Sequence, residues 1–556
     1  MRERGNLGKH TRPAPALKRA LTLTLIAIIF CSAFLSLDAV SAEFQQATAP
    51  VSDRFGVVSS HFVLNDPAAM DRELSAMADA GIKWIRFGMP WPDLEPSRGA
   101  WNFAKTDLAV NKAAARGIKV LGLLGGSPPW ANGGLPYVYP PTDLASWRHY
   151  LWTLATRYRG KVSAWEIWNE ENITWFWMWP DANAYVSLVK ETTPVIRSVD
   201  PSATIVMGGV AGLDPNFLDA CFKAGVADYV DAIAYHPYPE TFQFLNYEPQ
   251  ESNCRYIVDW LHSLMAAYTS KPLQLWITEF GWTTCSGTPP GVSEATQASY
   301  LLRTLVNYAG LPVDKVFYYN LYDESYDPAA QEANYGLLAN DFRKKPAYSC
   351  FATFERVLGD AVPAGAGSAS FTCTNPGTLE SHCFELADGS LVIALWKSDA
   401  VVDSVTVKVA DKEFGSPQMV DPISGETLSG LSFTRDADGT LSLNSIPVGG
   451  MPALLKVMPP SRFAVTDVSP DQSNQLTLMV GTQVTGSGFM PGARVRLEIG
   501  DRVLRPYNAT VVTGERIDCN FGFFLVGTGD YDLVVRNPDG SEARLNSAFK
   551  IKPLWW

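Results

Sequence analysis

The feature that most constrains the fold is a regular alternation of short β-rich runs and helical patterns between about residue 55 and residue 350. In the helical segments, apolar residues recur every three or four positions. Strands that alternate with helices require parallel pairing and right-handed crossovers. The β-rich runs are Phe55–Val58, Trp84–Phe87, Val120–Leu124, Ala164–Trp168, Ile205–Met207, Ala232–Tyr235, Leu275–Thr278 and Val316–Tyr319.

Eight such units in about 300 residues predict a (β/α)8 barrel over 43–355. A doubly wound open sheet is the alternative, but no Gly-x-Gly-x-x-Gly turn follows the first run. From about residue 356 the helical period is absent. Short strands separated by turn signals such as Ala387-Asp388-Gly389 predict a β-sandwich over 356–460. Pro459-Pro460 marks a linker to a second β unit over 461–556.

The first 42 residues have the pattern of an export signal. A basic start is followed by an apolar run, Ala20–Leu37, and by the small residues 39–42. This pattern predicts a secretory signal peptide cleaved after Ala42, and an uncleaved membrane anchor is the alternative. We therefore expect a secreted, periplasmic or cell-surface protein. Its local disulfide candidates are Cys373 with Cys383 and Cys254 with Cys285.

Charge and motif content exclude several classes of function. The formal charge of −12, without a long Lys/Arg run, argues against nucleic acid as a partner. No Cys-x-x-Cys, His-x-x-x-His or Asp-rich calcium loop is present, so we expect no metal. No nucleotide loop of the Gly-x-x-x-x-Gly-Lys type is present either, and we expect no cofactor.

Two glutamates follow strand ends that a barrel would bring to one rim. The fourth run leads into Asn169-Glu170, and the seventh leads into Thr278-Glu279. Function in this fold is built at the carboxyl ends of the strands. Hydrolysis of a glycosidic bond needs such a pair, one acid to protonate the leaving oxygen and one carboxylate on the other side of the sugar. The alternative is that one glutamate is only an ion-pair partner.

The segments 168–170 and 278–282 resemble the two catalytic motifs of the clan A retaining glycoside hydrolases. Within the clan, residues 55–458 most resemble glycoside hydrolase family 39. The resemblance implies that Glu170 is the general acid/base and that Glu279 is the nucleophile, which forms a covalent glycosyl-enzyme. It also implies carboxyl groups about 5 to 5.5 Å apart and retention of the anomeric configuration.

The same resemblance suggests roles for the neighbours of the two glutamates. Asn169 would hydrogen-bond the sugar 2-hydroxyl, and Arg86 would keep Glu279 ionised. His236 and Tyr238 would line the sugar site. An ordinary ion pair for Arg86 and a core position for His236 remain open.

Further polar residues lie near these motifs in the sequence. His61 could contact a sugar hydroxyl or lie exposed in a loop. Glu171 is expected to point away from Glu170. Glu166 is expected to pair with a cation in the barrel.

Tryptophan is unevenly distributed, with 14 of the 17 between Trp84 and Trp282. Sugar rings stack on aromatic rings, so those after strand ends could line a polysaccharide cleft, although packing of the loops is the alternative. The eighth run has no tryptophan, and Phe317, Tyr318 or Tyr319 would then form the floor of the sugar site. The aromatic candidates for substrate contact are Trp130, Trp175, Trp177, Trp179, Trp282 and Tyr318.

Three blocks of the last β unit, 465–470, 484–489 and 535–541, resemble the immunoglobulin-like IPT/TIG domain. The resemblance implies a role in attachment, with a carbohydrate or cell-surface ligand. The chain as a whole therefore predicts an exported retaining glycoside hydrolase that acts on a polysaccharide or oligosaccharide. A non-catalytic carbohydrate-binding or cell-surface protein on a retired barrel, and a transglycosylase that uses the same residues, are the alternatives.

Overall fold

The computed structural model describes residues 49–238, 249, 251–287, 291–365, 367–409, 417–428, 431–436, 440–458, 463–538 and 540–553. The expected signal peptide and the Pro459-Pro460 linker lie outside these residues. No helix in the described part of the chain is both long and apolar enough to cross a membrane.

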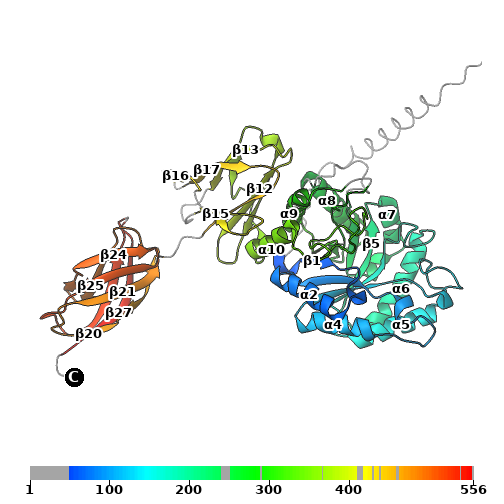
Figure 1. The fold of residues 1–556 in the computed structure, drawn as a ribbon, viewed down its shortest axis with the longest axis horizontal. Helices are drawn as coiled ribbons and strands as arrows, with labels where there is room; N and C mark the ends of the chain where they lie inside the picture. Colours follow the sequence, from blue (N-terminus) through cyan, green and yellow to red (C-terminus); the bar gives the residue numbers. More distant parts are fainter. Residues whose placement is uncertain are drawn as a thin grey trace, which may run out of the picture. The chain divides into compact units, whose positions relative to one another are not determined.

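Eight parallel strands close into a barrel surrounded by helices, which confirms the fold class (Figure 1). The first and last strands pair, with Phe55 opposite Val316. The strands are β1 (Phe55–Val58), β2 (Trp84–Gly88), β3 (Lys119–Leu124), β4 (Ala164–Asn169), β5 (Thr204–Ala211), β6 (Ala232–His236), β7 (Gln274–Ile277) and β8 (Lys315–Tyr318).

Large aromatic side chains take part in filling the barrel interior. Trp84, Trp276 and Phe317 pack with their ring centroids about 6 Å apart, in one cluster with small and branched residues from neighbouring strands. The barrel is therefore a packed core, and function must be built at its rim.

The helices of the barrel begin at residues that the sequence favours for this role. Acidic or hydroxyl side chains accept hydrogen bonds from the first free backbone N–H groups of five helices, at Asp66, Asp143, Asp181, Asp214 and Ser293. The helices are α2 (Pro67–Asp79), α3 (Trp91–Leu94), α4 (Ala104–Ala115), α5 (Leu144–Tyr158), α6 (Ala182–Val199), α7 (Pro215–Lys223), α8 (Glu251–Tyr268), α9 (Glu294–Ala309) and α10 (Pro346–Leu358).

The expected boundary between barrel and sandwich at 355/356 falls inside α10, which continues to Leu358. Two antiparallel sheets follow. One has the order β10 (Ser370–Thr372), β13 (Asp403–Val409), β17 (Leu441–Val448), β16 (Phe433–Arg435). The other has the order β15 (Thr427–Leu428), β14 (Pro417–Val420), β18 (Ala453–Val457), β12 (Leu391–Lys397), β11 (Leu379–Glu385), β9 (Val362–Pro363).

The second of these sheets shares a hydrophobic core with the barrel. Phe384 and Trp396 belong to the same buried cluster as the barrel residues. Polar contacts add to this interface, since Arg303 Nε donates to the Gly450 carbonyl at 2.6 Å and His382 Nε2 lies 2.9 Å from Asn307 Oδ1.

The structure differs from the predicted disulfide between Cys373 and Cys383. Both residues have free thiols.

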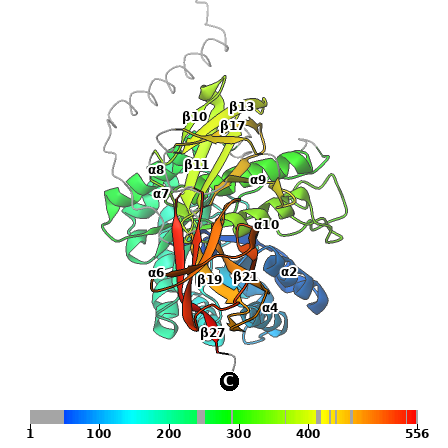
Figure 2. The same cartoon turned by 90° about the vertical axis from the view of Figure 1, so that its left-hand side faces the viewer.

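The last β unit has strands joined by turns, with no helix among its described residues (Figure 2). It has a hydrophobic core of its own. One sheet has the order β19 (Ala464–Ser469), β21 (Val480–Ser487), β25 (Arg516–Phe521), β24 (Asn508–Thr513). The other has the order β20 (Gln472–Asn474), β27 (Glu542–Lys552), β26 (Gly529–Arg536), β22 (Arg494–Ile499), β23 (Arg502–Leu504). The two sheets form an immunoglobulin-like sandwich.

Candidate active site

The end of β4 adopts an uncommon backbone conformation. Trp168 has φ 72° and Glu170 has φ 46°, in the left-handed region that non-glycine residues rarely occupy. Each such residue costs about 1 to 2 kcal/mol, so the surrounding structure must hold it in place. The backbone N–H of Glu170 donates to the Gly209 carbonyl on β5 at 3.0 Å. Strain of this kind is concentrated at functional sites.

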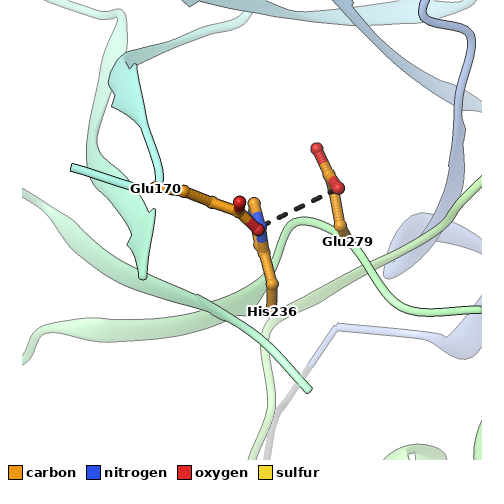
Figure 3. Close-up of side chains that lie close together, drawn as sticks. All are labelled: Glu170, His236 and Glu279. Carbon is orange, nitrogen blue, oxygen red and sulfur yellow. Dashed lines mark hydrogen bonds and ion pairs between the residues drawn. The ribbon is translucent and has the colours of Figure 1, made fainter. Parts of the chain in front are cut away.

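Glu170, His236 and Glu279 come together at the ends of β4, β6 and β7 (Figure 3). His236 Nδ1 lies 2.8 Å from Glu170 Oε1 and 3.8 Å from Glu279 Oε2. One carboxylate oxygen of each glutamate lies within 4.8 Å of the other. The barrel thus brings the two sequence-predicted glutamates, 109 residues apart in the chain, to the same nitrogen of one imidazole.

Arg86 hydrogen-bonds Glu279 of this pair and two further polar residues. Its Nη1 lies 2.5 Å from Glu279 Oε1, its Nε 2.5 Å from Glu166 Oε2, and its Nη2 2.8 Å from Asn169 Oδ1. Burial would lower the pKa of Arg86, but Glu166 and Glu279 raise it above its ordinary value. The side-chain oxygen of Asn169 accepts from Arg86. The side-chain NH2 group of Asn169 is therefore the one left to donate to a ligand.

Glu279 is held as a carboxylate by its surroundings. Burial would raise its pKa, but the charges of His236 and Arg86 outweigh this effect and keep the pKa below its ordinary value. The Tyr238 hydroxyl donates to Glu279 Oε2 at 2.8 Å. Burial, and next to it the charge of Glu279, raises the pKa of Tyr238 well above its usual range, so this hydroxyl keeps its proton.

The hydrogen-bond chain around His236 assigns its protons. Glu166 is paired with Arg86, and the Thr278 hydroxyl donates to Glu166 Oε1 at 2.7 Å. The Thr278 oxygen therefore accepts from His236 Nε2, which lies 3.0 Å away. Nδ1 then shares a proton with Glu170. Burial would lower the pKa of His236, but Glu279 and Glu170 raise it above its ordinary value.

A third carboxyl group lies at the rim and was not anticipated from the sequence. Glu324, in the loop after β8, accepts from Asn320 Nδ2 at 2.6 Å and lies 3.4 Å from His61 Nδ1. Burial raises the pKa of Glu324, and Glu279 acts in the same direction, while His61 lowers it. No motif identifies this residue, and its position after a strand end is the one signal that could have found it.

The loop after β4 presents some of the predicted aromatic residues and buries others. Trp175 is 82% exposed, whereas Trp177 is only 2% exposed. Trp177 packs edge-to-face on Trp168, with a centroid distance of 5.1 Å. The structure thus differs from the prediction of substrate contact by Trp177, because this ring anchors the loop to the barrel.

The remaining aromatic candidates vary in the same way. Trp130 is half-buried, with its indole N–H donating to the Glu95 carbonyl at 3.1 Å, and Trp282 is buried against Phe280. Tyr318 is fully buried and its hydroxyl donates to the Tyr335 carbonyl, so it does not form the floor of the sugar site. Tyr319, whose ring packs against Tyr238 at 6.2 Å, is the aromatic residue of that segment beside the site.

Glu171 does not contribute to the pair, as expected. It is fully buried, and neither of its carboxyl oxygens has a hydrogen-bond partner among the described residues. Burial, followed by the charges of Glu166 and Glu170, raises its pKa well above the ordinary value. Its burial therefore favours the protonated form.

The three clustered residues could in geometric terms offer a nitrogen and two oxygens to a metal ion. The surrounding charges disfavour this use. Arg86 places its guanidinium on Glu279, and His236 already shares a proton with Glu170. A cation at this position would face the positive charge of Arg86 directly.

The closed barrel, with two carboxyl groups close together at the ends of its strands, is the arrangement of a barrel glycosidase. The family described as Cellulase (glycosyl hydrolase family 5) matches residues 44–324, half of the chain. The chain belongs to this family of clan A glycoside hydrolases.

The match to relatives with assigned activities extends over only part of each relative. A β-xylosidase of Geobacillus stearothermophilus is 27% identical over 319 residues, which are 51% of this chain and 62% of that protein. A β-xylosidase of Caldicellulosiruptor saccharolyticus is 25% identical over 243 residues, 40% of this chain and 49% of that protein. The chain thus spans about half to three fifths of the length of these two relatives.

Solved structures of glycoside hydrolase family 39 share the fold. The structure from Bacteroides cellulosilyticus WH2 has a TM-score of 0.56 at 23% identity and covers 73% of this chain and 82% of its own. The enzyme from Xanthomonas axonopodis pv. citri has a TM-score of 0.53 at 18% identity, and the match covers 76% of this chain and 99% of that enzyme.

Proposed function

We propose that the protein is a retaining β-glycosidase of the family 39 type, with Glu279 as nucleophile and Glu170 as acid/base. The observation that carries this proposal is the short distance between the two carboxyl groups, since one oxygen of Glu170 and one of Glu279 lie within 4.8 Å of each other. Retaining enzymes hold this pair about 5 to 5.5 Å apart, whereas inverting enzymes leave about 6.5 to 9.5 Å for a water molecule.

The residues of the site would divide the reaction into two displacements. In the first, Glu279 Oε attacks the anomeric carbon, the bond to the leaving oxygen breaks, and Glu170 gives that oxygen its proton. In the second, Glu170 takes a proton from water, the water oxygen attacks the anomeric carbon, and the bond to Glu279 breaks. The proton shared between Glu170 and His236 is placed for the first step, and Arg86 and Tyr238 hold Glu279 ionised for the attack.

A retired barrel is the less favoured alternative. Arg86, Asn169, His236 and Tyr238 all hydrogen-bond one of the two glutamates or each other at the rim. A binding surface has no need for one carboxylate held ionised beside another that shares a proton.

We further propose that the chain is exported and that its last domain, of the IPT/TIG type, attaches the enzyme to a carbohydrate or cell-surface ligand.

The substrate to test first is a β-xyloside, because the relatives with assigned activity are described as β-xylosidases. Purified enzyme is incubated with an aryl β-xyloside and other aryl β-glycosides, and the configuration of the first-formed sugar is read by NMR. We expect the β-anomer to form first. Initial formation of the α-anomer would contradict the two-displacement mechanism.

Glu170→Ala tests the acid role. On natural oligosaccharides it should lose about 100-fold to 10,000-fold in kcat/KM, the range of general acid catalysis. On an aryl glycoside whose leaving group needs no protonation the first step should be largely retained. Equal losses on both substrates would remove Glu170 from the acid role.

A further inference from the structure

Exposed aromatic side chains follow Glu170 in the chain, and backbone hydrogen bonds hold the loop that carries them. The backbone N–H of Ile173 donates to the Glu170 carbonyl at 3.0 Å, and that of Trp177 donates to the Ile173 carbonyl at 3.0 Å. The Trp168 indole N–H donates to the Phe176 carbonyl at 2.8 Å. With Trp177 buried as the anchor, Trp175 and Trp179 are left 82% and 72% exposed.

A second loop, after β3, adds to the same surface. The backbone N–H of Met178 donates to the Val138 carbonyl at 3.1 Å, which joins the two loops. Beside this bond, the rings of Tyr139 and Trp179 meet edge to face at 5.5 Å. Tyr137 is 59% exposed on the same loop. We call Tyr137, Tyr139, Trp175 and Trp179 the aromatic platform.

Two features argue that the aromatic platform exists for a ligand. Exposed tryptophans leave large apolar areas in water, and clustered exposure of this kind marks binding sites. Trp179 also has φ 57°, an unfavourable conformation for a residue with a side chain, which the loop maintains while leaving the ring exposed.

Position and charge identify the occupant. The general acid contacts the leaving oxygen of the substrate, and the loop with Trp175 begins at that acid, so the platform is continuous with the leaving-group side of the proposed site. Neither loop carries a charged residue, from Gly125 to Thr142 or from Asn172 to Pro180. An uncharged aromatic surface fits the apolar faces of neutral sugar rings and offers no partner to a charged polysaccharide.

We propose that the aromatic platform binds the leaving-group portion of a neutral polysaccharide, beyond the bond that is cleaved. This proposal rests on the proposed function for the direction of the chain across the site. The enzyme then acts within or near the end of a polymer. It gains affinity from the sugars of the leaving group, in addition to the sugar that is transferred to Glu279.

Binding is tested separately from catalysis by affinity electrophoresis. Wild-type enzyme is run in gels that contain xylan, β-glucan or β-mannan, beside the double variant Trp175→Ala/Trp179→Ala. Trp152→Ala is the matched control, because this tryptophan is likewise exposed, by 50%, but lies on α5 outside the platform. We expect at least one of these neutral polymers to slow the wild type and the control and to leave the double variant unretarded. No retardation of the wild type in any of them would overturn the proposal.

Kinetics then test the position of the platform. With β-xylo-oligosaccharides of increasing length, KM of the double variant should rise about tenfold for the longer substrates. On an aryl β-xyloside its kcat/KM should stay within about twofold of wild type. Equal losses on both substrates would overturn the proposal. If a polymer slows the wild-type enzyme but the enzyme hydrolyses no glycoside, the proposed function is rejected, while the proposal that the platform binds a neutral polysaccharide is supported.

A protein partner or a second copy is the competing occupant of the platform. Gel filtration of wild type and double variant distinguishes it. We expect the same elution volume for both. A larger wild-type species that the double variant loses, with unchanged binding to the polymers, would assign the platform to self-association and overturn the proposal.

Discussion

Arg86 is the residue on which the proposed nucleophile depends. It is almost fully buried, and its guanidinium contacts Glu166, Asn169 and Glu279 together. Removing one partner from a buried charge pair costs about 3 to 5 kcal/mol, because the other charge is left without compensation. Arg86 thus acts on Glu279 from β2, a strand three positions away from β7 around the barrel.

Replacement of Arg86 should move the acidic limb of the pH profile. Glu279 must be ionised to attack, so the fall of kcat/KM at low pH follows its pKa. Without the cation beside it that pKa rises, and the limb should shift to higher pH in Arg86→Met and less in Arg86→Lys, which keeps a charge. Profiles of the three proteins check this, and an unmoved limb in both variants would show that Arg86 does not control Glu279.

Glu171 should make stability depend on pH. Its pKa in the folded chain lies well above the value of about 4.3 in an unfolded one. The folded state therefore holds the proton more tightly, so this contribution to stability is complete below about pH 4.3 and is lost as the pH rises through the folded pKa. Glu171→Gln stays neutral throughout.

We expect the melting temperature of Glu171→Gln to equal that of wild type at low pH and to exceed it increasingly as the pH rises. Thermal unfolding followed by circular dichroism at several pH values checks this. Glu385→Gln, at an exposed carboxyl group, is the control and should show no such trend. A constant difference at all pH values would mean that Glu171 is ionised in the folded chain.

At the scale of single elements, the barrel strands were predictable from the sequence because each is a short apolar run between helical segments. The structure places β1 on the predicted residues and extends β5 by four residues beyond the predicted end at Met207. The glutamates at the ends of β4 and β7 were predictable for the same reason, since strand ends share a rim.

The loops were less predictable. Four aromatic residues follow each other closely after β4, and their order does not show which of them the backbone will turn inward. Left-handed residues at Trp168, Glu170 and Trp179 set the direction of the loop, and these conformations have no sequence signal in non-glycine residues. The sequence therefore predicts substrate contact for Trp177, although its ring is buried. Tyr318 is buried as well, because the last residue of β8 turns its ring into the core.

Trp177→Ala should destabilise the barrel because it empties a site between Trp168 and Tyr185. Loss of a large buried aromatic side chain costs about 3 to 5 kcal/mol. We expect a clear fall in the melting temperature, together with loss of activity as the loop after Glu170 loosens. Trp175→Ala, five residues from the same glutamate but exposed, should melt as wild type does. Equal melting of both variants would contradict the role of Trp177 as the anchor.

At the scale of the whole molecule, the three parts differ in how they depend on each other. The sandwich shares a buried core with the barrel and hydrogen-bonds to Ser299 and Arg303 of α9. The last β unit has a separate core, which includes Val484, Phe521 and Phe549. The first two parts should therefore fold as one unit, and the third should be separable from it.

Removal of residues 461–556 should leave kcat/KM on an aryl glycoside within about twofold of wild type. Truncation after Leu358 should instead give an unstable or insoluble chain, because it uncovers the barrel surface against which Phe384 and Trp396 pack. Activity and thermal unfolding of the two truncated chains check this. A loss of catalysis on removal of the last domain alone would show that it contributes to the site.

The most direct test of the two-carboxylate mechanism is to trap the covalent glycosyl-enzyme. A 2-deoxy-2-fluoro glycoside with a good leaving group, carrying the sugar that the enzyme accepts, slows the second displacement, and peptide mapping by mass spectrometry then locates the attached sugar. We predict one added sugar on the peptide that contains Glu279, and none in Glu279→Ala. Attachment to another residue, or hydrolysis at the wild-type rate by Glu279→Ala, would contradict the account.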